Sequence, residues 1–449
     1  MENVLPLRKK TVNFTKIVIP ILITQIALYM MTFFDILMTG RYDTHDLAGV
    51  TIGSSFWVPV YTGLSGILMG LTPMIAHYIG GNRKNEVRPS VQQGLYVAIV
   101  LAAVVFTIIM LAVIPSLQHM PLEGQVRIVA ADYLKGMTIG LLPLFAYTVL
   151  RAFFDALGAT RVSMSIILLS APINIVLNYL LIFGKFGFPE LGGAGAGYAS
   201  GFTYWIVFGI AFFIAKLRKP FLTFSLFSRW ERVSFKRWKE ILRIGVPIGL
   251  SIFVEISIFS VVTLLMSGYT TETISAHQIA LNFTSLLYMV PLSISMGATI
   301  LVGQSIGAGK FKEARSYSFL AVGLAILFSF VSIIILLTFR EPIASLYTTD
   351  KSIIQLATHF FLFAAFFQLS DAIQAPIQGS LRGYKDVNMT FIMAIISFWI
   401  IGLPVGYLTA EFTNLGPFGY WVGLIVGLTI GAFTLSIRLI HIQRRYANN

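Results

Sequence analysis

Three acidic side chains interrupt long apolar stretches: Asp35 in QIALYMMTFFDILM, Glu255 in VPIGLSIFVEISIF and Asp371 in FLFAAFFQLSDAIQAPI. A charged group at the centre of a bilayer costs about 2.5–3.5 kcal/mol on insertion scales, so such residues are rare in membrane spans without a function. Facing a cavity, a carboxylate can take up and release a proton or bind a cation. We therefore expect the chemistry of this protein at these three residues.

Two pairs of amide side chains could support the carboxylates. Asn174 and Asn178 are four residues apart, as are Gln278 and Asn282, so each pair shares one face of a helix. The first pair could donate hydrogen bonds to a carboxylate or coordinate a cation, or it could simply bond neighbouring helices. The second pair could complete a lining around the acids of the second half.

Phe367 lies one helical turn before Asp371 and should share its face. Two carboxylates beside an aromatic ring suit a monovalent cation or a protonated amine, through charge and cation–π attraction. If the cation is Na⁺, its ligands would be Glu255 and Asp371. The two acids could alternatively share one proton.

These residues must be positioned by membrane-spanning helices. The chain of 449 residues is 56% hydrophobic and only 11% charged, whereas soluble domains have about 25% charged residues. We predict an all-α membrane protein with twelve spans, each long enough to cross a bilayer: 14–38, 47–79, 91–115, 126–150, 162–184, 194–217, 241–267, 276–306, 317–338, 352–379, 388–410 and 417–440. The absence of cysteine excludes disulfides and thiolate metal sites.

The positive charge follows the membrane topology. With the N-terminus inside, 26 of the 32 Lys and Arg residues fall on the inner side, which is the positive-inside pattern. We expect both termini to be cytoplasmic in a multi-pass protein of a bacterial plasma membrane. The net charge of +13 therefore reports topology and possible contact with anionic lipid headgroups, and not nucleic-acid binding.

The two halves of the sequence are repeats. A constant shift aligns 47–88 with 274–315 without a gap, and IGGNRKNEVR (79–88) matches IGAGKFKEAR (306–315) best. Pro20 and Pro247 occupy equivalent turns. Each half has six spans, so we expect parallel repeats related by an axis along the membrane normal: an N-terminal lobe (1–215), a cytoplasmic linker (216–240) and a C-terminal lobe (241–449).

The sequence resembles the multidrug and toxic compound extrusion (MATE) family over its whole length. Asp35 in FFDILMTG is similar to the family's helix-1 aspartate, and LGGAGAGYASG to its glycine-rich entry to helix 6. Glu255 and Asp371 resemble the acidic pair of the NorM-like branch. Phe367 stands where some members carry a tyrosine, so the aromatic face is kept without the hydroxyl.

The resemblance implies a V-shaped pair of six-helix lobes and an antiporter that exports lipophilic organic cations. The coupling ion would be Na⁺ or H⁺, with no cofactor, and we expect a monomer in the lipid bilayer without enzymatic activity. Two other kinds of transporter remain as alternatives: a major-facilitator drug/H⁺ antiporter and a lipid-linked oligosaccharide flippase. The loop GGNRKNEVRPS has Asn82 and no Asp, so it lacks the Asp–Arg-containing motif that is usual in the former. The buried charges are acidic, whereas the latter needs a cationic cavity for its phosphate.

Overall fold

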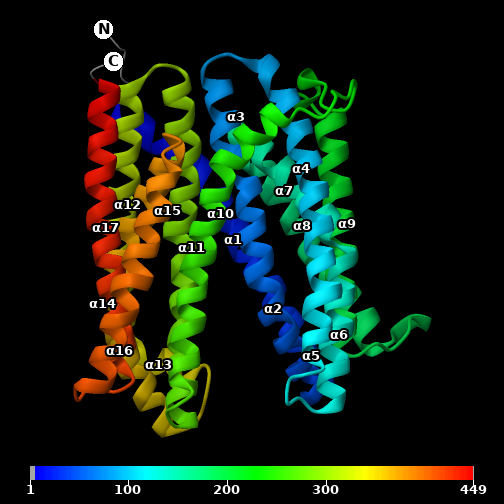
Figure 1. Ribbon diagram of the computed structural model, residues 1–449, viewed down its shortest axis with the longest axis vertical. Coiled ribbons are helices and arrows are strands. Elements are labelled where there is room, and N and C mark those ends of the chain that lie inside the picture. The colour runs from blue at the N-terminus through cyan, green and yellow to red at the C-terminus, as the bar shows by residue number, and fades with distance from the viewer. Residues whose placement is uncertain (1–5, 448–449) are drawn as a thin grey trace. The chain divides into compact units, whose positions relative to one another are not determined.

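The protein is described by a computed structural model in which residues 6–447 are placed. Within these residues the regular structure is entirely helical (Figure 1). The helices up to the connecting segment are α1 (Leu7–Tyr42), α2 (Thr44–Met69), α3 (Leu71–Gly80), α4 (Val87–Ile108), α5 (Ile114–Leu117), α6 (Gly124–Ile139), α7 (Leu141–Ala156), α8 (Thr160–Phe183) and α9 (Gly193–Leu217). Those after it are α10 (Phe235–Met266), α11 (Thr271–Gly307), α12 (Phe311–Thr338), α13 (Arg340–Ser345), α14 (Lys351–Gly383), α15 (Val387–Ala394), α16 (Leu403–Phe412) and α17 (Phe418–Ala447).

The prediction of an all-α membrane protein is confirmed. Within the described residues, eleven helical segments are long and apolar enough to cross a membrane, and a twelfth is formed if α6 and α7 are one bent span. These two helices meet at Gly140 with a bend of 48°. Gly140 lets α9 approach closely at this bend, because a Cβ there would lie 2.8 Å from the Cα of Gly201 in α9.

Large apolar side chains cover much of the surface. Leu111, Leu264, Phe366 and Phe433 are each at least two-thirds exposed. A soluble protein rarely exposes this much contiguous apolar surface, whereas hydrocarbon chains solvate it well. The surface therefore supports the membrane assignment independently of composition.

The chain forms two compact units, and the boundaries between them fall inside helices. Unit 2 comprises Ile23–Gly249, and unit 1 comprises the described residues up to Leu22 together with those from Leu250 onward. The start of α1 therefore belongs to the unit built by the second repeat, and the start of α10 belongs to the unit built by the first. Residues 216–240, the predicted linker, are grouped with unit 2.

We call the start of α1 and the start of α10 the exchanged helix starts, because each belongs to the unit built by the other repeat. The two exchanged starts pack at positions that are equivalent in the two repeats. In unit 2 a Cβ on Gly70 would lie 2.7 Å from the Cα of Gly245 in α10. In unit 1 a Cβ on Gly297 would lie 2.5 Å from a methyl carbon of Val18 in α1. The alignment of the two repeats pairs Gly70 with Gly297 and Val18 with Gly245. The internal repeat is therefore also a repeat of packing contacts.

The segment between α9 and α10 is fixed to the start of α4 by hydrogen bonds. The Gln92 side chain donates to the carbonyl oxygens of Leu226 (2.6 Å) and Arg229 (2.9 Å). The Gln93 amide donates to the Arg232 carbonyl (2.9 Å). Its oxygen accepts from the Ser234 amide of the segment (2.9 Å) and from the Trp238 indole N–H of α10 (2.9 Å). The segment is thus an ordered part of unit 2.

Unit 1 is organised around α14, which packs against α11, α12 and α17 (Figure 1). In unit 2, α9 packs against α6, α7 and α8. Polar side chains are buried on and beside these helices.

Candidate functional site

The first buried polar cluster surrounds Asp35 in unit 2. Asn178 of α8 donates a hydrogen bond to Asp35 Oδ1 (2.5 Å), and the Ser200 hydroxyl of α9 donates to Asp35 Oδ2 (3.2 Å). Asp35 therefore faces α8 and α9 with both carboxylate oxygens engaged. The structure brings Asp35 and Asn178 together as the sequence suggested.

Asn174 extends this cluster along the same face of α8. Its Oδ1 accepts a hydrogen bond from Asn178 (3.2 Å), and its Nδ2 donates to Ser200 and Thr203 (both 3.4 Å). Both asparagines are completely buried. Asn178 Oδ1 is buried and has no hydrogen-bond partner among the residues that the structure describes. The cluster thus offers a carboxylate and a free amide oxygen, which are ligands suited to a hard cation.

Two residues of this cluster were not predicted from the sequence. Ser200 and Thr203 lie just after the glycine-rich start of α9, where Gly197 and Gly201 let α9 approach α6 closely. Hydroxyl side chains within a few residues of these glycines were the available signal. Tyr133 and Tyr204 also lie within electrostatic range of Asp35.

The second cluster surrounds Glu255 in unit 1. Gln378 of α14 donates a hydrogen bond to Glu255 Oε1 (2.5 Å), and Gln374 donates a second one to the same carboxylate. The Arg382 guanidinium, also on α14, attracts Glu255 electrostatically. Glu255 is therefore compensated by two amides and a positive charge.

Asp371 has different surroundings from Glu255. Its side chain is 6% exposed, and its Oδ2 has no hydrogen-bond partner within residues 6–447. It interacts electrostatically with Glu255, so the structure places both acids in one cluster. Gln374 Oε1 and Ser397 Oγ are likewise buried without a hydrogen-bond partner in the described part of the chain.

The residues around the acids form a stripe that the sequence reading missed. Gln374, Gln378 and Arg382 follow Asp371 at intervals of three, four and four residues, which places all four on one face of α14. The segment DAIQAPIQGSLR carries this periodicity in plain form. A search for polar spacing within the spans, and not for acids alone, would have found it.

Phe367 lies in an aromatic packing cluster one turn from Asp371. Its ring meets Phe259 edge-on with centroids 5.9 Å apart, and Trp421 edge-on at 6.0 Å. The side chain is 4% exposed. Its suggested cation–π contact stays a prediction.

Gln278 and Asn282 do not lie on the buried face of α11. Both are exposed, whereas His277 and Thr284 of the same helix are buried. A spacing of four residues correctly places the pair on one face, but it cannot say which face is buried. Their role in lining an ion site stays a prediction.

Asp350 marks the start of α14. Its Oδ1 accepts hydrogen bonds from the Ser352 hydroxyl (2.9 Å) and the Ser352 amide (2.8 Å). These hydrogen bonds hold the pKa of Asp350 below its usual value. Asp350 is therefore a helix cap.

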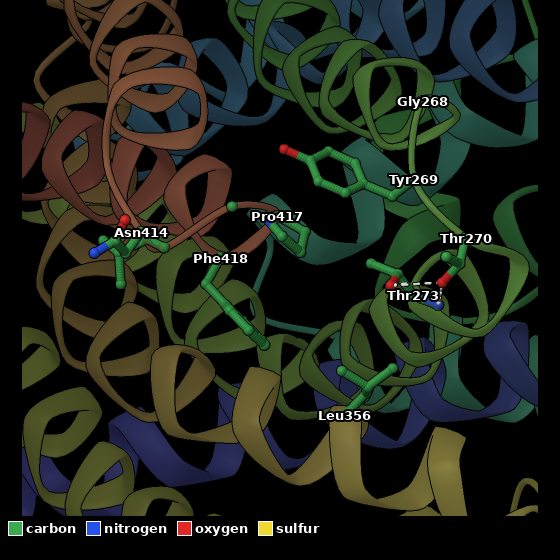
Figure 2. A pocket seen from close by; sticks show the side chains of 10 residues that line it. Gly268, Tyr269, Thr270, Thr273, Leu356, Asn414, Pro417 and Phe418 are labelled. Atoms are coloured by element: carbon green, nitrogen blue, oxygen red, sulfur yellow. Dashed lines mark hydrogen bonds between the residues drawn. The ribbon is translucent and has the colours of Figure 1, made fainter.

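A wide depression of about 770 Å³ lies between the α10–α11 and α16–α17 loops of unit 1. Tyr269, Thr273, Leu356 and Phe418 surround its opening, and Thr270 is hydrogen-bonded to Thr273 (Figure 2). Its described lining includes none of the residues proposed from the sequence. The buried clusters on α8 and α14 are therefore the better candidates for chemistry.

Comparison with known proteins identifies the family. The family model MatE matches residues 20–180 and again 247–408. The two matches begin at Pro20 and Pro247, which are equivalent positions of the repeats, so the model finds the internal repeat independently. The chain is 52% identical over 440 residues to a probable multidrug resistance protein NorM of Halalkalibacterium halodurans, covering 98% of this chain and 96% of the relative. It is also 52% identical to a probable multidrug resistance protein NorM of Bacillus subtilis, covering 98% and 97%.

Solved structures share the fold. An outward-facing multidrug resistance MATE family transporter of the MOP superfamily superposes with a TM-score of 0.87 at 18% identity, covering 96% of each chain. A eukaryotic MATE transporter superposes with a TM-score of 0.85 at 21% identity, covering 98% of each chain. The whole chain, including both repeats, therefore belongs to the MatE family of multidrug and toxic compound extrusion transporters.

Proposed function

We propose that the protein is a secondary active efflux antiporter that exports lipophilic organic cations in exchange for Na⁺ or H⁺. The multidrug resistance names of relatives at about half identity support this substrate class. The observation that carries the proposal is the buried Asp371 carboxylate, whose Oδ2 has no hydrogen-bond partner within the described chain. A buried polar atom without a partner is costly, and a bound cation or proton would remove that cost.

The two acids of unit 1 have different surroundings, which suggest different roles for them. Glu255 is held by Gln378, Gln374 and the charge of Arg382. Asp371 offers an unused oxygen beside it. In this mechanism the coupling ion binds at Asp371, and Glu255 adds negative charge to the site. Ion and drug compete, which supplies the unfavourable coupling that exchange requires.

Asp35 would be the corresponding ion-responsive group of unit 2. Its carboxylate is satisfied by Asn178 and Ser200, while Asn178 Oδ1 has no partner among the described residues. If Asp35 takes up a proton, Asn178 Oδ1 could accept a hydrogen bond from it. If a cation binds there instead, the same oxygen could coordinate it. We propose further that the protein acts as a monomer in a bacterial plasma membrane, with both termini cytoplasmic.

Ethidium efflux into everted vesicles under an imposed Na⁺ or H⁺ gradient tests the proposal. We expect Asp371→Asn to abolish most of the ion-driven initial rate, because ion binding would no longer weaken drug binding by the roughly 5- to 150-fold that is typical of coupled sites. Asp35→Asn and Glu255→Gln are tested beside it. Glu272→Gln, which changes an exposed acid at the start of α11, is the matched control and should transport like wild type.

Two outcomes separate the parts of the proposal. Comparing the two gradients identifies the ion, since only the coupling ion should drive transport. Unchanged efflux in all three acid variants would refute the assignment of the ion sites. No drug efflux under either gradient, with correctly folded protein, would refute the antiport function itself.

A further inference from the structure

A groove of about 550 Å³ follows α12 from its start in unit 1. Lys312, Arg315 and Phe319 line it, and Gly323 continues the same line. Spacings of three and four residues place these positions along one face of the helix. The groove therefore has a basic end near the helix start and an apolar part deeper in the predicted span.

The basic end has positive charges without acidic neighbours. None of the described residues that line the groove is acidic. The nearest acid in sequence, Glu313, is buried and pairs with Lys310 at 3.7 Å. The Arg315 guanidinium carbon lies 5.5 Å from the centroid of the Phe319 ring, so this charge is held over the groove.

A third cation approaches from α1. The Lys10 ammonium donates a hydrogen bond to the Ser316 hydroxyl (2.7 Å) and is itself buried. Ser316 also lines the groove. Two basic side chains of α12 therefore line the basic end, and one of the polar lining residues is bonded to a buried cation of α1.

The apolar part of the groove is open. No described atom outside its own helix lies within 4 Å of the position that a Cβ on Gly323 would occupy. Phe319 is 53% exposed, and Leu7 of α1 is 67% exposed. The missing side chain at Gly323 leaves open space beside Phe319.

The internal repeat shows what covers the same face in unit 2. Continued along these helices, the alignment of the repeats pairs Arg315 with Arg88, Phe319 with Gln92, Leu320 with Gln93 and Gly323 with Tyr96. In unit 2 this face lies under the connecting segment, where Gln92, Gln93 and Tyr96 bond its backbone. The Arg88 guanidinium lies 3.4 Å from the Glu231 carboxylate of that segment.

The two helices are aligned in the correct register, because the positions that face the core of one helix pair with positions that face the core of the other. Pairs related by the alignment are buried in both helices: Ser90 and Tyr317, Val91 and Ser318, Gly94 and Ala321, Ala98 and Ala325. The two faces therefore occupy equivalent positions on the two helices. Where unit 2 has glutamines under a peptide segment with a carboxylate, unit 1 has apolar residues and an arginine without a carboxylate.

We propose that the groove binds an anionic phospholipid. The phosphate replaces the Glu231 carboxylate and lies between Lys312 and Arg315. One acyl chain follows Phe319 and passes over Gly323. The bound phosphate belongs to a lipid and not to a soluble anion, because the apolar part of the groove lies on a membrane-spanning helix. The helix start lies on the side predicted to be cytoplasmic, where anionic lipids concentrate.

Lipid binding to the full-length protein tests this proposal. Delipidated protein in a neutral detergent is titrated with phosphatidylglycerol or phosphatidylcholine, and bound lipid is counted by native mass spectrometry. We expect K312Q/R315Q to bind phosphatidylglycerol roughly ten- to thirtyfold more weakly, from about 1 kcal/mol per basic residue. K236Q/K239Q removes two exposed charges at the start of α10 and should bind like wild type.

Filling the groove tests the acyl-chain part. G323W keeps all charges but occupies the open space beside Phe319, and it should also weaken phosphatidylglycerol binding; G323L serves if the larger variant does not fold. Inorganic phosphate should not compete with the lipid at equal concentration. Equal lipid binding by wild type and K312Q/R315Q would overturn the proposal. Equal binding of phosphate and lipid, with no effect of filling Gly323, would instead identify a soluble-anion site.

Discussion

At the scale of single residues, His277 shows how a buried polar group is fixed in unit 1. The indole N–H of Trp421 donates a hydrogen bond to His277 Nδ1 (3.0 Å), and Thr263 Oγ1 lies 3.2 Å from Nε2. An indole N–H can only donate, so Nδ1 accepts and the proton of the neutral ring is on Nε2. The ring therefore joins α10, α11 and α17 beside the aromatic cluster of Phe367.

We expect His277→Leu to destabilise the protein by about 1–3 kcal/mol, because it leaves the buried Trp421 N–H without an acceptor. The measurement is thermal unfolding in detergent. His359→Leu changes an exposed histidine of α14 and should have little effect. Equal melting temperatures for both variants would contradict this role for His277.

The same residues show the limits of prediction from the sequence. The acids and the Asn174–Asn178 pair were found because charge and amide groups are costly in a bilayer and therefore conspicuous. The Gln278–Asn282 pair was placed on a common face, but its exposure depends on how α11 packs, which spacing does not specify. Gln374, Gln378 and Arg382 were missed because the search began with acids.

At the scale of elements, the connecting segment depends on two adjacent glutamines. Gln93 alone bonds the Arg232 carbonyl, the Ser234 amide and the Trp238 indole N–H. Each such bond contributes about 0.5–1.5 kcal/mol. The segment is rich in Lys and Arg, so its ordering should protect it from trypsin.

We expect Gln93→Ala to raise the rate of tryptic cleavage in residues 216–243 by about tenfold or more, since cleavage follows the population of the opened segment. Gel electrophoresis of timed digests gives the rate. Gln278→Ala, an exposed glutamine of α11, is the matched control. If both variants are cleaved as slowly as wild type, Gln93 does not hold the segment.

The positions of the spans, but not the ends of their helices, could be predicted well from the sequence. Spans must satisfy their backbone hydrogen bonds internally, so apolar length and helix coincide. The helices mostly extend past the apolar stretches, as α10 does in beginning at Phe235. The bend at Gly140 was not predicted, although Pro143 lies three residues later and lacks the backbone N–H that would bond to Ile139.

At the scale of the whole molecule, the repeats and the compact units divide the chain at different places. The repeats meet in the connecting segment, whereas the units exchange the starts of α1 and α10. Pro20 and Pro247 each lie two residues before the end of an exchanged start. Proline weakens the helix there by removing a backbone hydrogen bond.

We expect fragments 1–228 and 229–449 to resist proteolysis only when they are expressed together, because each holds a helix start that packs in the other unit. Co-purification through a tag on one fragment is the measurement. Removing residues 1–22 from the first fragment should weaken the association. Two fragments that are each protease-resistant alone would show that the exchanged starts are dispensable.

The exchanged helix starts also constrain how such a molecule could arise by duplication. A single six-helix copy would have to place the start of its first helix on a second copy and receive the same segment in return. That is the arrangement of a domain-swapped homodimer. Fusion of the two genes would then preserve the swap, and the Gly70–Gly245 and Val18–Gly297 contacts would be its two surviving halves.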